Sequence, residues 1–426
     1  MNSEQAKNYL HSLLKAMLTK KASDLFLSND FPPSMKIDGK MTSVAPQKLT
    51  PVHTRALADA AMNDRQRAEF ETEKECNFAI SLEGIGRFRV NVFMQQGHVG
   101  MVLRTITTQI PKFEELHLPE VLKNVVLAKR GLVILVGGTG SGKSTSLAAM
   151  IDHRNEMTHG HIITIEDPVE YVHKNKNCLI THREVGVDTN GWFAALKNTL
   201  RQAPDVILIG EIRDRETMEY AIAFAETGHL CMATLHANSA NQALDRIINF
   251  FPEERRQQLL MDLSLNLKAV VSQRLIARAD GNGRRAAIEI LLNTPFVSDL
   301  IFKGEVHALK EQMAKSKEQG MQTFDQALFD LHESGAVSYE DALRNADSVN
   351  ELKLNIKLNS KRARSDDSRP KVELSLHEEK KDPEAAPESF NRPGIQSPAI
   401  ADRIAAKSTV SGPGERGLSA ATNRLS

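Results

Sequence analysis

The sequence predicts an α/β protein in which a small mixed N-terminal domain precedes a larger domain built on a mostly parallel sheet. Its length of 426 residues indicates two or three domains. Within residues 120–355, helical periodicity alternates with four short and almost continuously apolar runs: Leu132–Val136, Ile162–Ile165, Val206–Ile209 and Leu230–Thr234. Strands that are apolar on both faces are typical of a parallel sheet covered by helices on both sides.

Residues 1–106 predict the smaller α+β domain. A second helix is expected over Pro51–Phe70, and Arg87–Phe93 alternates apolar and polar residues, the period of a strand with one covered face. Residues 107–119 contain Pro111 and end at Pro119, which predicts a linker to the larger domain, residues 120–355. An opening helix is indicated by four apolar residues at helical spacing: Leu10, Leu13, Leu14 and Met17.

Residues 356–426 predict a disordered tail. They hold six of the 16 prolines and a single aromatic residue, Phe390, and their charged blocks alternate in sign. Such a segment cannot bury enough apolar surface to offset the chain entropy lost on folding. A tethered interaction tail is the alternative interpretation.

The composition narrows the class of protein. Hydrophobic residues make up 41% and charged residues 25%, as in ordinary soluble proteins. Lys plus Arg and Asp plus Glu both number 54, so the net charge is zero, which argues against nucleic-acid binding through bulk positive charge. Cys76, Cys178 and Cys231 form no CxxC pair, which excludes a disulfide framework and fits a reducing compartment. No apolar run reaches the ~18 residues of a membrane span, so we expect a cytoplasmic protein.

The strongest motif directly follows the apolar run Leu132–Val136 and precedes a helical segment. It matches the pattern G-x-x-x-x-G-K-[ST], whose glycines let backbone N–H groups wrap around phosphates. Lys143 is then expected to reach the β- and γ-phosphates of ATP, and the Ser144 hydroxyl to hold Mg²⁺. The predicted nucleotide-binding residues are Gly137, Gly138, Thr139, Gly140, Ser141, Gly142, Lys143, Ser144 and Thr145.

Two carboxylates follow predicted parallel strands, where such sheets bind ligands. Glu166, after Ile162–Ile165, is expected to orient or activate the attacking water. Glu211, after Val206–Ile209, is expected to contact Mg²⁺ through water. The structural alternatives are a polar loop cap for Glu166 and a helix cap for Glu211.

One histidine stands on each side of the run Leu230–Thr234. We interpret His236 as a sensor of the γ-phosphate; for His229 the sensor and structural roles stay equally open. Zinc is disfavoured because the two histidines lie seven residues apart without a cysteine partner.

Three arginines lie on or beside strands predicted in the N-terminal domain: Arg87, Arg89 and Arg104. By themselves they are ordinary surface residues. They become candidates because P-loop enzymes often receive an arginine from a neighbouring domain or subunit, which accelerates hydrolysis by about 10³–10⁵.

Taken together, these motifs resemble those of the secretion-type hexameric ATPases, and within them the type IV pilus retraction ATPases, PilT and PilU. The resemblance covers residues 1–355. It rests on four elements in order: a Walker A loop at 137–145, an Asp box at 164–170, a Walker B segment ending at Glu211, and a His box at 229–236. It implies a PAS-like N-terminal domain joined to a RecA-like ATPase domain.

The resemblance also implies residue roles and a branch. Arg89 and Arg104 correspond to arginine fingers, with Arg87 beside them and Arg246 near the nucleotide. The chain lacks the tetracysteine element and the longer N-terminal region of the extension and secretion branches. Where the PilT branch carries AIRNLIRE, Phe296–Lys303 reads FVSDLIFK, a departure that favours the PilU branch.

A member of this branch is expected to be a homohexameric ATPase that uses ATP and Mg²⁺ and drives or assists pilus retraction. Its expected partners are a PilT-like hexamer and the inner-membrane pilus platform, at the cytoplasmic face of the inner membrane and without direct nucleic-acid contact. Two alternatives stay open: an adaptor ring that depends on a PilT motor, and a secretion- or extension-type ATPase.

Overall fold

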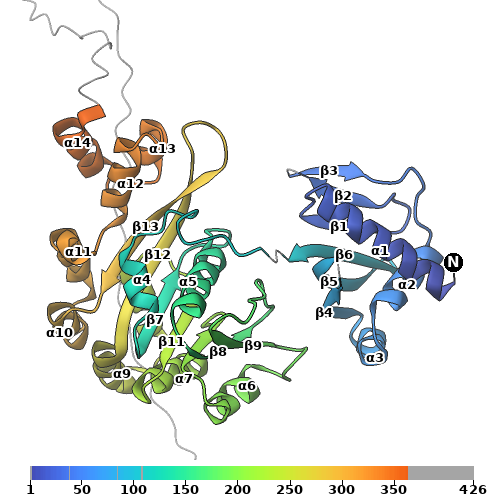
Figure 1. Ribbon diagram of the computed structural model, residues 1–426, viewed down its shortest axis with the longest axis horizontal. Helices are drawn as coiled ribbons and strands as arrows, with labels where there is room; N and C mark the ends of the chain where they lie inside the picture. Colours follow the sequence, from blue (N-terminus) through green and yellow to red (C-terminus); the bar gives the residue numbers. More distant parts are fainter. Residues whose placement is uncertain (1, 38, 84, 107–108, 363–426) are drawn as a thin grey trace, which may run out of the picture. The chain divides into compact units, whose positions relative to one another are not determined.

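The computed structural model describes residues 2–37, 39–83, 85–106 and 109–362 (Figure 1). The chain divides into two compact units, residues 1–368 and 369–426, and the second lies outside the described residues. Within the described part, no helix has both the length and the apolar character needed to cross a bilayer.

Helix α1 (Ser3–Thr19) confirms the predicted opening helix. Asn2 begins it with a capping box, in which Asn2 and Gln5 each accept from the other's backbone N–H. The apolar residues at helical spacing all point into the core, as expected. The stretch predicted as one helix over Pro51–Phe70 is instead two, α2 (Pro51–Ala61) and α3 (Asp64–Glu73), because Asn63 accepts from the Gln66 N–H and starts a new helix.

The N-terminal strands form one antiparallel sheet in the order β3-β2-β1-β6-β5-β4. Its core gathers apolar residues of α1, α2 and the sheet, such as Leu14, Leu57 and Val90. Strand β3 was not predicted, because its residues are all exposed and so show no apolar pattern. The strands are β1 (Asp24–Leu27), β2 (Ser34–Ile37), β3 (Lys40–Ser43), β4 (Glu75–Leu82), β5 (Gly86–Gln95) and β6 (His98–Ile106).

The second sheet has seven strands in the order β13-β12-β7-β11-β10-β8-β9. All neighbours run parallel except the β12–β13 hairpin, which confirms the predicted mostly parallel sheet. The strands are β7 (Gly131–Val136), β8 (Gly160–Glu166), β9 (Cys178–Glu184), β10 (Val206–Ile209), β11 (Leu230–Leu235), β12 (Leu267–Ala277) and β13 (Arg284–Leu292).

Helices cover both faces of this sheet. On β7, Ile134 belongs to the apolar cluster beneath one set of helices, whereas Val133 and Leu135 belong to the cluster on the opposite face. Since successive side chains of a strand point to opposite faces, this division explains why the strands read as unbroken apolar runs. The helices are α4 (Val121–Val126), α5 (Lys143–Met157), α6 (Trp192–Thr199), α7 (Arg215–Glu226), α8 (Ala240–Asn249) and α9 (Glu253–Asn266).

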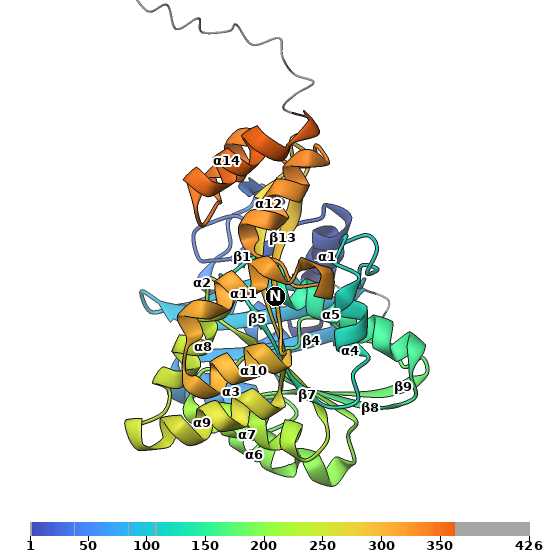
Figure 2. The ribbon, with the colours of Figure 1, turned by 90° about the vertical axis from the view of Figure 1, so that its left-hand side faces the viewer.

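The remaining helices lead away from α9, with α10 beside it and α12 and α14 at the far end (Figure 2). The last of them, α14, buries Leu352 and Ile356 in a small cluster with Phe324 and Leu328. The predicted start of the tail at residue 356 is therefore too early, because Ile356 is still part of a hydrophobic cluster. Residues 363–426 of the predicted tail lie outside the described part of the chain. The helices are α10 (Pro295–Lys303), α11 (Leu309–Lys315), α12 (Phe324–Glu333), α13 (Tyr339–Arg344) and α14 (Val349–Asn359).

Candidate active site

The glycine-rich loop lies between β7 and α5, as the sequence predicted. Two of its glycines are required by close packing. A Cβ on Gly137 would lie 2.4 Å from Ser141 Oγ and 2.6 Å from Gln273 O. Gly142 has a φ of 87°, and a Cβ there would lie 2.7 Å from Gln273 Nε2. The backbone therefore approaches β12 more closely than other residues allow.

This loop has the features of a phosphate site. Lys143 begins α5, and the first N–H groups of a helix have no partner inside it, so they favour an anion. Lys143 Nζ donates to Gly137 O at 2.8 Å and to Gly138 O at 3.1 Å, and burial lowers its pKa, opposed by the charges of Glu211 and Glu170. The Ser141 hydroxyl is buried without a hydrogen-bond partner. Phosphate oxygens would supply acceptors for the Ser141 hydroxyl and the first N–H groups of α5, so the residues fit a bound nucleotide.

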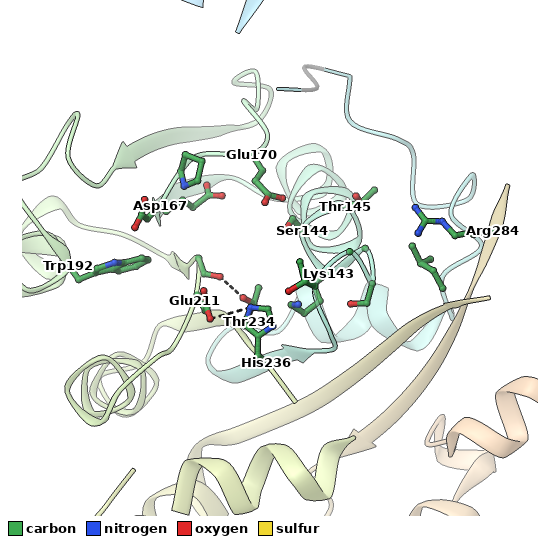
Figure 3. A pocket seen from close by; sticks show the side chains of 18 residues that line it. Lys143, Ser144, Thr145, Asp167, Glu170, Trp192, Glu211, Thr234, His236 and Arg284 are labelled. Carbon is green, nitrogen blue, oxygen red and sulfur yellow. Dashed lines mark hydrogen bonds and ion pairs between the residues drawn. The ribbon is translucent and has the colours of Figure 1, made fainter. Parts of the chain in front are cut away.

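A cavity of about 440 Å³ opens beside the loop (Figure 3). It brings together Thr139–Thr145, Glu166, Glu211 and His236, all predicted site residues from distant parts of the sequence. Figure 3 shows Glu170 and Asp167 on one side of Lys143 and Arg284 on the other. The carboxyl ends of β8, β10 and β11 supply the residues facing the loop, the edge at which parallel sheets bind ligands.

Glu166 is the last residue of β8. Burial raises its pKa to about 7, helped by the negative charges of Glu170 and Glu184 and opposed by hydrogen bonds from the Thr164 hydroxyl and the Glu170 N–H. The backbone of Gly210, which follows the adjacent strand β10, lies close to Glu166. A Cβ at Gly210 would lie 3.1 Å from the Glu166 Cα, so a glycine there permits the close packing. A carboxylate that titrates near neutral pH can accept a proton.

Glu211 and His236 follow the neighbouring strands β10 and β11. Glu211 Oε1 lies 3.3 Å from His236 Nε2, and Glu211 Oε2 accepts from Arg213 Nε at 2.9 Å. The Thr234 hydroxyl donates to Gly210 O at 2.5 Å and ties the two strand ends together (Figure 3). Arg246, predicted near the nucleotide, donates to His236 O at 2.7 Å.

His229 lies at the opposite end of β11. Its Nδ1 contacts Thr227 Oγ1 at 3.0 Å and Phe224 O at 3.2 Å, and it does not line the cavity. The strand Leu230–Leu235 separates the two histidines by about 3.3 Å per residue, so they cannot meet at one edge. The structural role, left open for His229 from the sequence, is therefore the one this arrangement supports.

The three predicted arginines do not line the cavity either. Arg89 of β5 is the cross-strand neighbour of Arg104 on β6, and Arg104 Nε lies 2.8 Å from Asp24 Oδ1. Arg87 Nη2 donates to Glu184 Oε2 at 2.5 Å.

Three residues that line the cavity lie outside the predicted motifs and were missed: Trp192, Leu275 of β12 and Arg284. Trp192, the only tryptophan, begins α6, and Arg284 begins β13. Arg284 reaches the site through the β12–β13 hairpin, a tertiary arrangement without a local pattern. For Trp192, the only hint in the sequence was that the chain contains a single tryptophan.

Comparison with known proteins shows the family to which this chain belongs. The family model of the Type II/IV secretion system proteins matches residues 2–366. The type IV pilus ATPase PilU of Pseudomonas aeruginosa is 62% identical over 348 residues, 82% of this chain and 91% of PilU. The pilus retraction ATPase PilT of the same organism is 44% identical, over 76% of this chain and 94% of PilT. The crystal structure of the pilus retraction motor PilT with bound ADP superposes with a TM-score of 0.75 at 39% identity and covers 81% of this chain and 98% of that one.

The fold and the loop at its sheet edge thus define a P-loop ATPase of the α/β class. The chain belongs to the Type II/IV secretion system protein family, and within it to the type IV pilus ATPases that PilU and PilT represent.

Proposed function

We propose that this protein hydrolyses ATP and uses the energy to drive or assist pilus retraction, in the manner of PilU. The observation that carries the proposal is the convergence of Lys143, Glu166 and Glu211 on one cavity, in a chain 62% identical to a type IV pilus ATPase. An intact set of phosphate-binding and carboxylate residues favours a working ATPase over an adaptor ring without hydrolysis.

The proposed roles follow from position. The loop N–H groups and Lys143 bind the β- and γ-phosphates, while Glu166 orients the attacking water and accepts its proton. Ser144 and Glu211 both line the cavity and would hold Mg²⁺, which prefers one or two protein oxygens together with phosphate oxygens and water. Bound Mg²⁺ would neutralise charge on the phosphates. His236, held against Glu211, would respond to the γ-phosphate.

The assembly is proposed to be a homohexamer. The six-stranded sheet corresponds to a PAS-like domain over residues 1–106. The seven-stranded sheet, with the helices that follow it up to α14, corresponds to a RecA-like domain that begins at residue 120. Arg89 and Arg104 lie outside their own chain's cavity, which fits a role at the ATP of the next subunit. There their charges would attract the triphosphate and close the cleft between subunits, and loss of the γ-phosphate would weaken that attraction.

This motion would act on the inner-membrane pilus platform from the cytoplasmic side, together with a PilT-like hexamer. The replacement of AIRNLIRE by FVSDLIFK at 296–303 supports dependence on such a partner. Phe296 and Phe302 are 54% and 50% exposed on α10, so this segment offers a surface different in chemistry from that of the PilT motif.

The direct test is ATP turnover by the purified ring, alone and mixed with a PilT-like hexamer. Lys143→Ala should abolish turnover by this chain while its circular dichroism spectrum stays unchanged. Lys129→Ala is the matched control, an exposed lysine that does not line the cavity. Unchanged turnover in Lys143→Ala would refute the assignment of the loop.

The cellular test compares deletion strains. Loss of this gene should reduce twitching and raise the number of surface pili if the protein assists retraction. Bald cells would instead support an extension ATPase, and a secretion defect with normal pili would support the secretion branch.

A further inference from the structure

Behind Glu166, two adjacent parallel strands place a threonine and a histidine side by side. Thr164 of β8 is paired in register with His182 of β9, and Thr164 Oγ1 lies 2.9 Å from His182 Nδ1. Glu166 follows Thr164 by two residues, so both side chains lie on the same face of the strand. The Thr164 hydroxyl is close enough to the Glu166 carboxyl to lower its pKa.

The backbone N–H of His173 decides which atom donates in the hydrogen bond between His182 and Thr164. The backbone N–H of His173 donates to His182 Nε2 at 3.0 Å. A backbone N–H can only donate, so Nε2 carries no proton and the neutral ring must carry its proton on Nδ1. His182 Nδ1–H therefore donates to Thr164 Oγ1, which leaves the Thr164 hydroxyl proton free to donate to Glu166.

The surroundings hold the ring in this state. The His173 ring stacks on His182 with 5.7 Å between centroids and an interplanar angle of 13°. Burial lowers the pKa of His182, aided by Arg87 and opposed by Asp188 and by the His173 N–H, so the ring is neutral at pH 7. Thr164 is fully buried, so water does not compete for its hydroxyl. The other charged groups facing Glu166 are Glu170 and Glu184.

We infer that His182 and Thr164 form a positioning relay, in which a fixed histidine tautomer aims the Thr164 hydroxyl at Glu166 and so sets the orientation of the carboxylate. Neither residue lines the nucleotide cavity, so neither touches substrate. The inference rests on the proposed function, because it assigns the relay to the carboxylate proposed to handle the attacking water.

The first test compares two substitutions at Thr164. Thr164→Val keeps the branched shape but removes the hydroxyl, whereas Thr164→Ser keeps the hydroxyl. Because a hydrogen bond to a charged group is lost, Thr164→Val should lower kcat on the order of tenfold and leave KM for ATP unchanged. Thr164→Ser should stay within about twofold of the wild type.

The pH profile separates positioning from a general structural effect. The Thr164 hydrogen bond stabilises the charged form of Glu166, so its loss raises the pKa of that carboxyl. The acidic limb of the kcat profile should therefore move to higher pH in Thr164→Val, and the defect should shrink as the pH rises. A defect of equal size at every pH would overturn the inference.

The second test replaces the other end of the relay. His182→Asn retains an amide N–H near the Nδ1 position, whereas His182→Leu has no donor. We expect His182→Leu to reproduce the kcat loss and the pH shift of Thr164→Val, and His182→Asn to restore much of the rate. The double variant should lose no more than Thr164→Val alone, because both changes remove the same interaction. Additive losses would overturn the relay.

Binding of a fluorescent ADP analogue and melting temperature are measured for every variant. If the wild-type ring hydrolyses ATP but Thr164→Val matches Thr164→Ser, the relay is wrong while the proposed function stands. If the wild-type ring hydrolyses no ATP, alone or with a PilT-like hexamer, both are overturned.

Discussion

His236 Nε2 lies 3.3 Å from Glu211 Oε1, joining the ends of two adjacent parallel strands across the mouth of the cavity. The two residues stand 25 positions apart in the sequence, 211 and 236, and meet because β10 and β11 run in the same direction. His236 is 38% exposed and Glu211 20%, so the pair faces the site rather than the core. Both side chains line the cavity and are placed to contact a ligand bound in it.

The first prediction concerns this pair. His236→Ala should lower kcat by about tenfold to a hundredfold, because Glu211 loses a partner that fixes its orientation, while ADP binding is largely retained. His229→Ala on the same strand is the matched control and should leave turnover near the wild-type value. Steady-state hydrolysis and ADP titration measure both effects. Equal losses in the two variants would mean that the cavity does not distinguish these histidines.

The second prediction concerns the pH dependence of hydrolysis. The pKa of Glu166 is raised to about 7, so the carboxylate that we propose accepts the proton is only partly formed below neutrality. Turnover should rise with pH through about 7 and then level off, as measured by initial rates at saturating ATP.

The variant Glu170→Gln tests the direction in which the pH profile of turnover should move. Glu170 contributes a negative charge that raises the pKa of Glu166. Glu170→Gln removes that charge and should move the rise in turnover to lower pH. A shift to higher pH, or a profile without a limb near neutrality, would separate the limb from Glu166.

The third prediction concerns stability and a buried carboxyl outside the cavity. Glu289 of β13 is 1% exposed, its Oε1 accepts from the Ala240 N–H at the start of α8, and its Oε2 has no partner. Burial raises its pKa from 4.5 to about 7, with Asp347 adding to the rise and Lys310 and Arg274 opposing it.

The sign follows from proton binding. Between pH 4.5 and about 7 the folded protein keeps a proton that the unfolded chain has lost, so the contribution to stability is complete below pH 4.5 and declines as the pH rises to about 7. Glu289→Gln stays neutral and should remove this decline, a difference of about 3 kcal/mol across the window. Urea unfolding at several pH values measures it. Parallel stability curves for the two proteins would contradict the prediction.

The sequence predicted the parts of the site that are encoded locally. The glycine-rich loop carries its own geometry. Glu166 is the last residue of the apolar strand β8, and Glu211 comes two residues after the apolar strand β10. Parallel strands bring their carboxyl ends to one edge, so these residues could be placed together before any coordinates. Arg284 and Trp192 could not, because a hairpin and a helix start carry them to the cavity from outside the motifs.

The direction of the strand explains why His229, which the sequence left as a possible γ-phosphate sensor, does not line the cavity. Two histidines that bracket a strand look symmetrical in sequence, yet only the one at the carboxyl end, His236, reaches the cavity. The arginines Arg89 and Arg104 show a different limit of a single chain, since their expected partner is a phosphate bound to another copy. Helix ends were also hidden, because a side-chain cap such as that of Asn63 divides a stretch whose apolar spacing continues.

The fourth prediction concerns the boundary of the folded chain. Ile356 is 3% exposed and packs in the cluster that joins α14 to α12 and β12, although composition alone assigned it to the tail. Ile356→Ala should lower the free energy of unfolding by about 2–4 kcal/mol, because it leaves a cavity in a small cluster. Leu354→Ala, at a residue 56% exposed on the same helix, should change it by less than about 0.5 kcal/mol. Truncation after Arg362 should leave the melting temperature unchanged, whereas truncation after Ser348 should lower it by removing α14. If the chain truncated after Ser348 melts like the full chain, α14 contributes nothing to the stability of the fold, and the folded part ends before residue 349.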